Sequence, residues 1–291
     1  MILNGIEKIQ KLLPSVNLRL DSTRLDDFMS RAQQWVTDEI IGSGLEELLE
    51  TDIADGATDN HVMLRHLVQR VIAQYAYIMF GDEMNLQLSE AGMVVQQNQD
   101  MQAASSARRD NLMRSLDDRL DHDCDALVNY LMKSSFAKEG EENAPYEDWR
   151  KTEQFAYLTE AFLPTMKELR RHLPFKTSYT GHWADFNESL PNASIGMMDI
   201  AAGYVSSAEI VRLRKLYREN GLNEVQHQAV FRLQSVSAAC IVNDREQAIK
   251  SAIGARTIML DYLNDFPSFA ESDCKTLPGV DFNAGHLVNT L

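Results

Sequence analysis

The chain has 291 residues, of which 44% are hydrophobic and 24% charged, which is enough apolar material for a large core and excludes a disordered protein. The formal net charge of −15 repels DNA and anionic lipid, and no basic patch reverses this field, so sequence-specific nucleic-acid binding is disfavoured. Three cysteines without a CxxC pair indicate a reducing compartment and no disulfide framework.

No segment has the features of a membrane span or of a secretory signal. The most apolar long stretch, residues 63–80, carries Arg65, His66, Gln69 and Arg70, whereas a spanning helix needs about 20 mainly apolar residues. The first residues show no basic region followed by an apolar core. We therefore expect a soluble protein of the cytoplasm that does not contact a membrane.

The first clear helix is predicted over residues 21–41. Ser22 can cap its start by accepting a hydrogen bond from a free backbone N–H group, and the sequence GSG at 42–44 breaks it, because glycine is costly within a helix. Its inner face, recognised from helical spacing, comprises Leu25, Phe28, Ala32, Trp35 and Val36.

Two further helices are predicted next, over residues 61–80 and 106–132. Asp59 or Asn60 can cap the first of them and Gly81 can end it. In both, the apolar residues recur at the spacing of a single buried face. These faces comprise Leu64, Leu67, Val68, Val71, Ile72, Tyr75, Ile78 and Met79 in the first helix, and Leu112, Met113, Leu116, Leu120, Cys124, Leu127, Val128 and Leu131 in the second.

Between these helices, residues 84–98 predict a small β-hairpin. Apolar residues alternate with polar ones before the loop, a short β-favouring run follows it, and Gly92 suits a loop position with positive φ. Because a two-stranded hairpin alone is only marginally stable, we expect it to pack on its own helices or on another subunit. The candidate oligomer contacts are Leu86, Leu88, Met93, Val94 and Val95.

A linker is predicted at residues 138–148, where the chain is charged and contains Gly140 and Pro145. It separates an N-terminal helical domain, residues 1–137, from a C-terminal helical domain, residues 149–265. The second domain is predicted to hold a helix that Pro164 can begin, a broken helix followed by a longer one over residues 181–217, and two helices over residues 223–242 and 245–263. Residues 266–291 show no periodicity and predict an extended tail.

The predicted fold class is therefore mainly α, with two helical-bundle halves and a small β-hairpin insertion in the first. The halves share short similarities: LPSVNL at 13–18 resembles LPNASI at 190–195, and residues 127–139 resemble residues 259–272. Two interpretations stay open, a duplicated unit or chance similarity between helical sequences.

No motif for a phosphate cradle, a nucleophile elbow or an H-E-x-x-H zinc site occurs, which disfavours common nucleotide-dependent enzymes, hydrolases and zincins. We expect no cofactor. The best candidate for chemistry is the set Asp118, His122 and Asp125, which recurs at i, i+4 and i+7 and could offer one helix face to a divalent metal. The alternative is a solvated face of an amphipathic helix, so no metal site is assigned.

Other reactive or aromatic residues have structural explanations. Cys124 and Cys240 fall on apolar helix faces and are expected to act as small hydrophobic residues. His182, Trp183 and Phe186 lie together, either around a pocket or as anchors of the core near a helix start.

The segments LDDFMSRAQQWVTDEIIGSGLEELL, MLRHLVQRVIAQYAYIMF and NLQLSEAGMVVQQNQDMQAASSARRDNLMRSLDDRLDHDCDALVNYL resemble an uncharacterised family encoded in Bacteroides-type prophages and related mobile elements. That family looks like the head–tail connector proteins of tailed phages. In these, a helix ends in a W/I-x-x-x-I-G-type segment, a buried helix crosses it, a protruding hairpin or loop follows, and a long helix closes the unit. The resemblance covers most of residues 15–132, with a weaker second match over 150–265. Connector units usually hold one small helical domain, whereas two are predicted here.

The resemblance implies a non-enzymatic virion or neck component that forms a homo-oligomeric ring between portal and tail. Its partners would be further copies of itself together with portal and tail proteins. It would lie in the cytoplasm of the bacterial host and then in the virion. Two other classes stay open: a helical adaptor that binds its partner as a monomer, and a metal-dependent enzyme that uses Asp118, His122 and Asp125.

Overall fold

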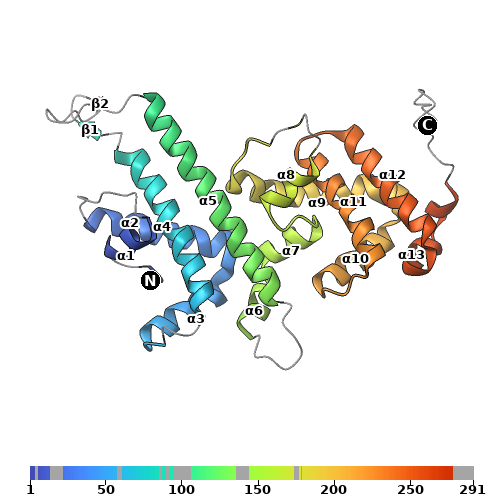
Figure 1. Cartoon of the computed structure of the whole chain (residues 1–291), viewed down its shortest axis with the longest axis horizontal. Helices are drawn as coiled ribbons and strands as arrows, with labels where there is room; N and C mark the ends of the chain where they lie inside the picture. The colour runs from blue at the N-terminus through green and yellow to red at the C-terminus, as the bar shows by residue number, and fades with distance from the viewer. Residues whose placement is uncertain are drawn as a thin grey trace. The chain divides into compact units, whose positions relative to one another are not determined.

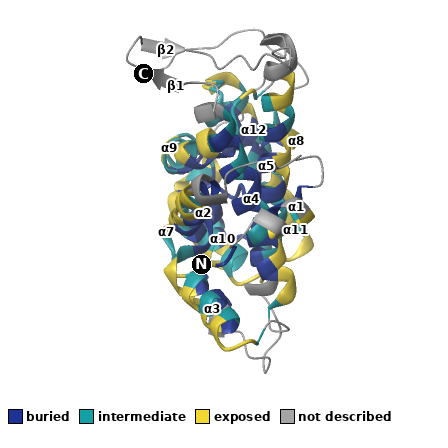
Figure 2. Ribbon diagram, turned by 90° about the vertical axis from the view of Figure 1, so that its left-hand side faces the viewer, coloured by how far each residue is buried: buried dark blue, intermediate teal, exposed yellow. Residues whose placement is uncertain are grey.

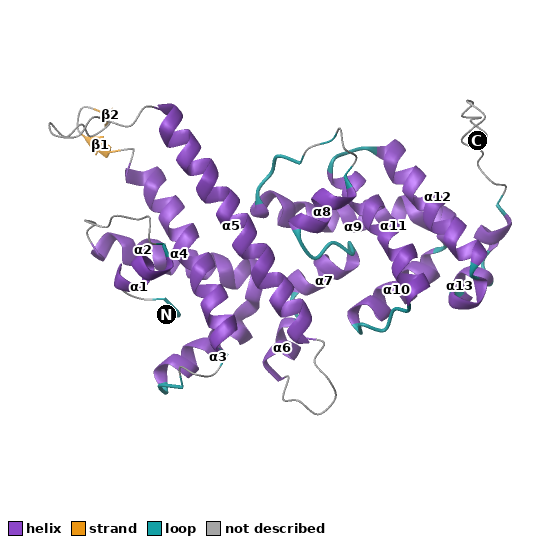
Figure 3. Cartoon of the chain, viewed as in Figure 1, coloured by secondary structure: helices purple, strands orange, loops and turns teal. Residues whose placement is uncertain are grey.

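The computed structural model describes residues 1–3, 6–13, 22–57, 61–84, 87–89, 92–94, 106–135, 144–173, 177 and 179–277 (Figure 1). Helices dominate the described residues, so the predicted mainly-α class is confirmed (Figure 3). None of the helices in these ranges is both long and apolar enough to cross a bilayer. The chain divides into two compact units. Unit 1 comprises Met1–Ala156, Pro164–Met166 and Thr180–Asn187, and unit 2 comprises Tyr157–Leu163, Lys167–Tyr179 and Glu188–Leu291.

Unit 1 holds the first part of the chain. Its elements are α1 (Ile6–Leu12), α2 (Ser22–Val36), the π-helix η1 (Thr37–Ile41), α3 (Gly42–Ala54), α4 (Val62–Met84), β1 (Gln87–Ser89), β2 (Gly92–Val94), α5 (Ser106–Ser135), α6 (Ala144–Trp149), the first half of α7 (Glu153–Glu160) and the first turn of α9 (Trp183–Val205).

The core of unit 1 forms around α4, which packs against both α2 and α5. Phe28 of α2 meets Phe80 of α4 edge to face, with ring centroids 5.6 Å apart. The predicted inner faces supply most of this core (Figure 2): Leu25, Phe28, Ala32 and Val36 on α2, Leu64, Leu67, Val68, Val71, Ile72 and Ile78 on α4, and Leu116, Leu120, Cys124, Leu127, Val128 and Leu131 on α5 are buried.

The ends of α4 and α5 differ from the sequence prediction. Leu112 is 52% exposed, so the inner face of α5 begins one turn later, at Leu116. Gly81 does not end α4, which continues to Met84. A Cβ at Gly81 would lie 3.7 Å from Met113 Sδ, in ordinary van der Waals contact, so the glycine lies where α4 still packs against α5.

The predicted break at residues 42–44 takes the form of a π-helix followed by a new α-helix. Gly42 begins α3 with φ 75°, a left-handed value that favours glycine, and a Cβ there would lie 2.7 Å from Thr152 Cγ2. The Ile40 carbonyl accepts a hydrogen bond of 2.8 Å from Nε1 of the buried Trp149 indole. A residue more than 100 positions later in the chain therefore anchors this irregular turn.

The predicted linker at 138–148 is partly helical. Residues 144–149 form α6, which packs against α3 and α5, and Trp149 is fully buried beside Phe155 with ring centroids 5.1 Å apart. Two aromatic residues are buried here, Tyr146 within the segment and Trp149 directly after it. The charged composition of the segment gave no indication of their burial. The division between the units falls later than this segment, at Ala156.

Within the predicted 84–98 hairpin, the structure describes Met84 and two strands of three residues each. β1 and β2 pair antiparallel with Gln87 opposite Val94, Leu88 opposite Met93 and Ser89 opposite Gly92. In the described part of the chain, their main contacts are with each other, and Figure 1 places them beyond the ends of α4 and α5. The pairing is too short to change the all-α character of the fold.

Unit 2 holds the later helices. Its elements are the second half of α7, α8 (Met166–His172, from Lys167), the rest of α9, α10 (Ser207–Arg218), α11 (Glu224–Ile241), α12 (Arg245–Asp261), the 3₁₀ turn η2 (Leu263–Asp265), the single turn α13 (Pro267–Ala270) and the 3₁₀ turn η3 (Asp273–Thr276). The two helices predicted over 223–242 and 245–263 correspond to α11 and α12, which pack along each other.

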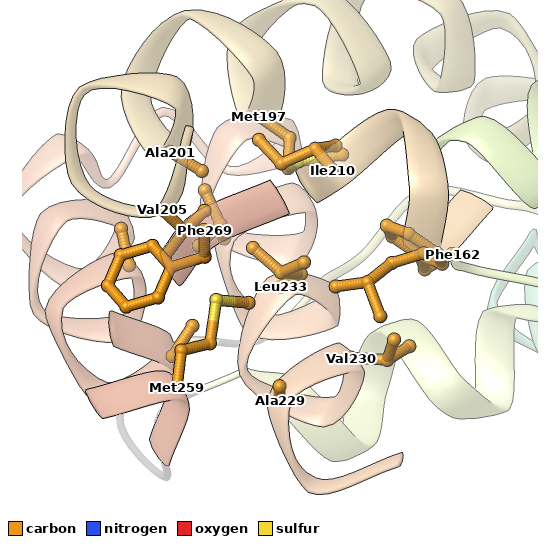
Figure 4. Packing of buried hydrophobic residues seen from close by; sticks show 14 of the residues in the cluster. Phe162, Met197, Ala201, Val205, Ile210, Ala229, Val230, Leu233, Met259 and Phe269 are labelled. Atoms are coloured by element: carbon orange, nitrogen blue, oxygen red, sulfur yellow. The ribbon is translucent and has the colours of Figure 1, made fainter. Parts of the chain in front are cut away.

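One cluster of buried side chains forms the core of unit 2. Figure 4 shows side chains from α9, α10, α11, α12 and α13 gathered around Leu233. The fully buried members include Phe162, Met197, Ala201, Val205, Ile210, Leu213, Ala229, Leu233, Val236, Ala252, Met259, Phe266 and Phe269.

Residues 266–277 differ from the predicted extended tail. Phe266 and Phe269 are fully buried in the core cluster. The guanidinium of Arg256 donates to the carbonyl oxygens of Cys274 at 3.0 Å and Lys275 at 3.3 Å, and also to that of Leu277. Two isolated aromatic residues and one distant arginine thus order this segment without any helical periodicity. Residues 278–291 lie outside the described residues.

The segment after the core helices is also fixed by Glu209 of α10, whose side chain is fully buried. Its Oε2 accepts from the backbone N–H of Phe269 at 3.0 Å, and its Oε1 accepts from Arg212 Nε at 2.8 Å. Arg212 Nη2 donates to the carbonyl of Asp265 at 2.6 Å. Because each charge has several partners, this buried ion pair joins α10 to the turns around α13.

The α9 helix is continuous where the sequence predicted a broken helix, and it contains Pro191. Proline lacks a backbone donor and usually breaks or kinks a helix. Here Trp183 and Phe186 before it and Met197 and Ala201 after it are buried, so packing holds both sides of the proline. Duplication, one of the two interpretations that the sequence leaves open, is not shown, and the two units have different orders of elements.

Candidate functional site

The acidic segment at residues 117–125, in the middle of α5, was the main candidate for chemistry. Asp121 is buried, and its Oδ1 accepts from the backbone N–H of Trp183 at 2.8 Å. Its Oδ2 lies 3.2 Å from His182 Nδ1. Trp183 is the first residue of α9, so a carboxylate from α5 caps this helix and satisfies an N–H that the helix itself leaves free.

Two further carboxylates of this segment are also engaged by the fold. Asp125 Oδ1 accepts from the backbone N–H of Met166 at 2.9 Å. Asp123 is buried and pairs with Arg70 of α4. Burial raises the pKa of the Asp123 carboxyl, although the nearby Arg70 guanidinium partly opposes this effect. The segment therefore serves mainly to join helices.

The three residues proposed as metal ligands do not converge. Asp118 and His122 are exposed and border a pocket of about 410 Å³, together with Arg70, Ser115 and Asp123. Asp125 does not border this pocket and bonds to Met166 instead. Within the described ranges, no group of three or more histidine, cysteine or acidic side chains is arranged to hold a metal ion.

We expect Asp121→Ala to lower the free energy of unfolding by about 1–2 kcal/mol, because it removes the cap of α9. Asp118→Ala, an exposed position one turn earlier on α5, is the matched control and should change stability by less than about 0.5 kcal/mol. Urea denaturation followed by circular dichroism measures both. Equal effects of the two substitutions would contradict a capping role for Asp121.

The candidate oligomer contacts lie in the least described part of unit 1. Leu86 and Val95 are outside the described residues. Leu88, Met93 and Val94 belong to β1 and β2, whose side chains are also outside the described set. Their proposed role therefore stays a prediction.

The predicted roles of the cysteines and aromatic residues can be compared with their surroundings. Cys124 is fully buried on α5, and burial raises the pKa of its thiol well above the usual value. Cys240 is half-buried, and burial together with Asp199 raises the pKa of its thiol to about 11. Both thiols are therefore protonated at neutral pH, which does not suit a nucleophile. Trp183 and Phe186 are buried anchors with ring centroids 5.3 Å apart.

Another pocket, larger than the one beside Asp118 and His122, lies in unit 2, and the sequence did not predict it. We call it the α9 groove. It has a volume of about 920 Å³ and is lined by Ser189, Asn192, Ala193, Gly196, Asp199, Ile200, Gly203 and Tyr204 of α9, by Ala239, Cys240, Ile241 and Asn243 at the end of α11, and by Arg245, Ala248 and Ile249 of α12.

Small residues make up the most buried part of the lining of the α9 groove. Ala193, Ala239 and Ala248 are buried, and a Cβ on Gly196 would lie 3.1 Å from Cys240 Sγ, so glycine permits the close approach of α9 to α11 there. A Cβ on Gly203 would meet nothing within 4 Å. The groove therefore has an apolar floor of small residues and open space toward Gly203.

Polar side chains form the rim of the α9 groove. Asn192, Asp199, Asn243 and Arg245 are all exposed. Among the described residues, neither Asp199 nor Arg245 takes part in an ion pair. An apolar floor with two opposite, unpaired charges at its rim is suited to binding another polypeptide surface.

Comparison with known proteins gives one match. Residues 22–158 match a family of unknown function, DUF6712. The matched residues run from the start of α2 into α7 and include the π-helix, the α4–α5 pair and Trp149. No curated protein and no solved structure matches the chain.

Proposed function

We propose that this protein, which over residues 22–158 is similar to a family of unknown function, is a non-enzymatic structural protein that assembles with copies of itself. In this proposal it is a head–tail connector-like component of a prophage, as the sequence resemblance implies. A neighbouring copy contacts the segment 84–98, which contains the described strands β1 and β2.

The proposal is carried by the position of β1 and β2. These strands contact chiefly each other within the described chain and lie beyond the ends of α4 and α5 (Figure 1). A two-stranded pair has only marginal stability in water, and each of its outer edges offers unpaired backbone N–H and C=O groups. A second copy that covers this pair would supply the missing hydrogen bonds and apolar contacts.

The acidic segment of α5 gives independent support. Asp121 and Asp125 accept hydrogen bonds from backbone N–H groups, and Asp123 pairs with Arg70, so these carboxylates have structural partners. A helical adaptor that binds one partner as a monomer is the second candidate, and the α9 groove favours it. The metal-dependent enzyme has less support, because Asp125 bonds to Met166, away from Asp118 and His122.

Replacement of residues 84–98 by a Gly/Ser linker of equal length is expected to lower the mass of the assembly while each chain of about 33 kDa stays folded. Equal length keeps the loop closure between α4 and α5 unchanged, so the loss of assembly would report the contact alone. Sedimentation equilibrium gives the mass, and circular dichroism checks that the helices persist.

The unaltered protein is the reference for this experiment. If the unaltered chain already sediments as a monomer, the assembly proposal fails and the monomeric adaptor gains support. If the linker variant keeps the mass of the unaltered assembly, residues 84–98 are not the contact that holds the copies together.

A further inference from the structure

We propose that the α9 groove is a second self-association surface, in which two copies pack α9 against α9 around a two-fold axis. Each copy places its Ile195 in the groove of the other, and Asp199 of each copy pairs with Arg245 of the other. This inference rests on the proposed self-association but uses residues of unit 2 only, whereas the segment at 84–98 belongs to unit 1.

The first argument is the shape of the surface. Alanine and glycine line part of the groove beside larger apolar residues, and a Cβ on Gly203 would meet nothing within 4 Å, which leaves room for a protruding side chain of a second helix. The α9 helix itself carries such a side chain. Ile195 is 61% exposed, the highest fraction among the large exposed hydrophobic residues of the described chain.

The position of Ile195 relative to the groove favours a symmetric partner. It lies three residues after Asn192 and four before Asp199, and this spacing places the three on one face of α9. Asn192 and Asp199 border the groove. A helix face that presents its own protruding residue beside its own groove is self-complementary, as a two-fold interface requires.

The second argument is the charge of Arg245. This residue is the first of α12, where the partial positive charge of a helix start makes a cation unfavourable. Its neighbours in the sequence have partners within the chain: Asp244 caps α12 by accepting from Gln247 N at 3.0 Å, and Glu246 pairs with Lys250. Arg245 has no described ion pair and borders the groove, so a carboxylate from outside would compensate its charge.

The third argument is charge complementarity. The chain has a net charge of −15, so two copies repel each other unless opposite charges meet at their contact. Asp199 and Cys240 both line the groove, and the charge of Asp199 contributes to the raised pKa of the Cys240 thiol. Asp199, too, has no described ion pair. A two-fold arrangement would pair Asp199 with the second copy's Arg245 twice, once on each side of the axis.

The test measures the dissociation constant of self-association by sedimentation. We expect Asp199→Arg and Arg245→Asp, each alone, to weaken association on the order of tenfold or more, because each creates two like-charge contacts in the pair. Combining both substitutions in one chain should restore the affinity. Ile195→Ser should also weaken it. Asp261→Arg, at the far end of α12, has the same change of charge as Asp199→Arg, is its matched control and should leave the affinity unchanged.

Two results would overturn the inference. One is unchanged association of Asp199→Arg and Arg245→Asp, and the other is failure of the double substitution to recover affinity although circular dichroism shows a folded chain. Either result leaves the contact at 84–98 standing if the linker variant described above has a lower mass than the unaltered assembly. A monomeric unaltered protein would remove both proposals together.

Discussion

We expect Glu209→Ala to lower the free energy of unfolding by about 3–5 kcal/mol, the largest effect of any substitution considered for this protein. Glu209 is fully buried, and its carboxylate accepts from Arg212 and from the backbone N–H of Phe269. Alanine would leave a partly buried guanidinium and a buried N–H without this acceptor. Equilibrium denaturation in urea, followed by circular dichroism and by aromatic fluorescence, measures the change.

Two variants show whether this loss comes from the buried carboxylate. Glu209→Gln keeps the shape and one acceptor oxygen, so it should cost less than alanine. Glu219→Ala, at the exposed end of the same helix, should change stability by less than about 0.5 kcal/mol. A loss below about 1 kcal/mol for Glu209→Ala would show that α10 and α13 are held by apolar packing alone.

The second large effect is a dependence of stability on pH that originates at His172. Its side chain is fully buried, its Nδ1 lies 2.9 Å from Ser235 Oγ, and its ring packs on Phe231 with centroids 4.3 Å apart. Burial, with a smaller contribution from Arg171, lowers the pKa of His172 to about 4. Glu168 Oε2, at 3.8 Å from Nε2, is the acidic group nearest to the ring in the described ion pairs.

The direction in which stability changes with pH follows from the proton binding of His172 in the folded and unfolded states. In the unfolded chain the imidazole binds a proton as the pH falls below about 6.5, whereas in the folded chain it does so only near pH 4. The unfolded state therefore holds more protons between these values, and stability falls as the pH decreases through this window. The full difference corresponds to about 3 kcal/mol. Above pH 6.5 and below pH 4 this histidine contributes no further change.

His172→Phe should remove this part of the pH dependence, because phenylalanine keeps the ring packing but does not bind a proton. The measurement is the free energy of unfolding of both proteins between pH 7 and pH 4. We expect the unaltered protein to lose about 3 kcal/mol relative to the variant over this range. His227→Phe, at an exposed position on α11, is the control. Parallel pH curves for the unaltered protein and His172→Phe would contradict the assignment.

The helical faces could be read from the sequence because burial in a helix repeats every three to four residues. The faces of α4 and α5 carry this repeat over several turns, and most of their predicted residues are buried. The predicted ends and breaks of helices were less accurate where they depended on a single residue. Gly81 and Pro191 indicate a helix end and a break in isolation, yet packing on both sides keeps α4 and α9 continuous.

The structural use of the acidic segment could not be predicted, because its partners are distant in the chain. Asp121 and Trp183 are 62 residues apart, and Asp125 and Met166 are 41 apart. One local signal was present. Asp121 precedes Cys124 by three residues and Val128 by seven, so it lies on the buried face of α5 rather than on the solvated face. A carboxylate at such a position needs an internal donor.

The α9 groove could not be predicted, because the sequence of α9 is that of an ordinary helix with many small residues. Its floor combines α9 with the ends of α11 and α12, and only the folded chain brings these together. The exposed Ile195 and the position of Arg245 at a helix start could both have been noticed, but neither predicts the other.

The π-helical turn between α2 and α3 also determines which face of α3 is turned toward the core. Successive residues of an α-helix are about 100° apart around the axis, so removing one residue would turn α3 by more than a quarter of a revolution. Leu45 and Leu49, now fully buried, would then point away from their present neighbours. The number of residues in this stretch is therefore more tightly constrained than their identity. The hydrogen bond from the Trp149 indole to the Ile40 carbonyl fits only the present number of residues.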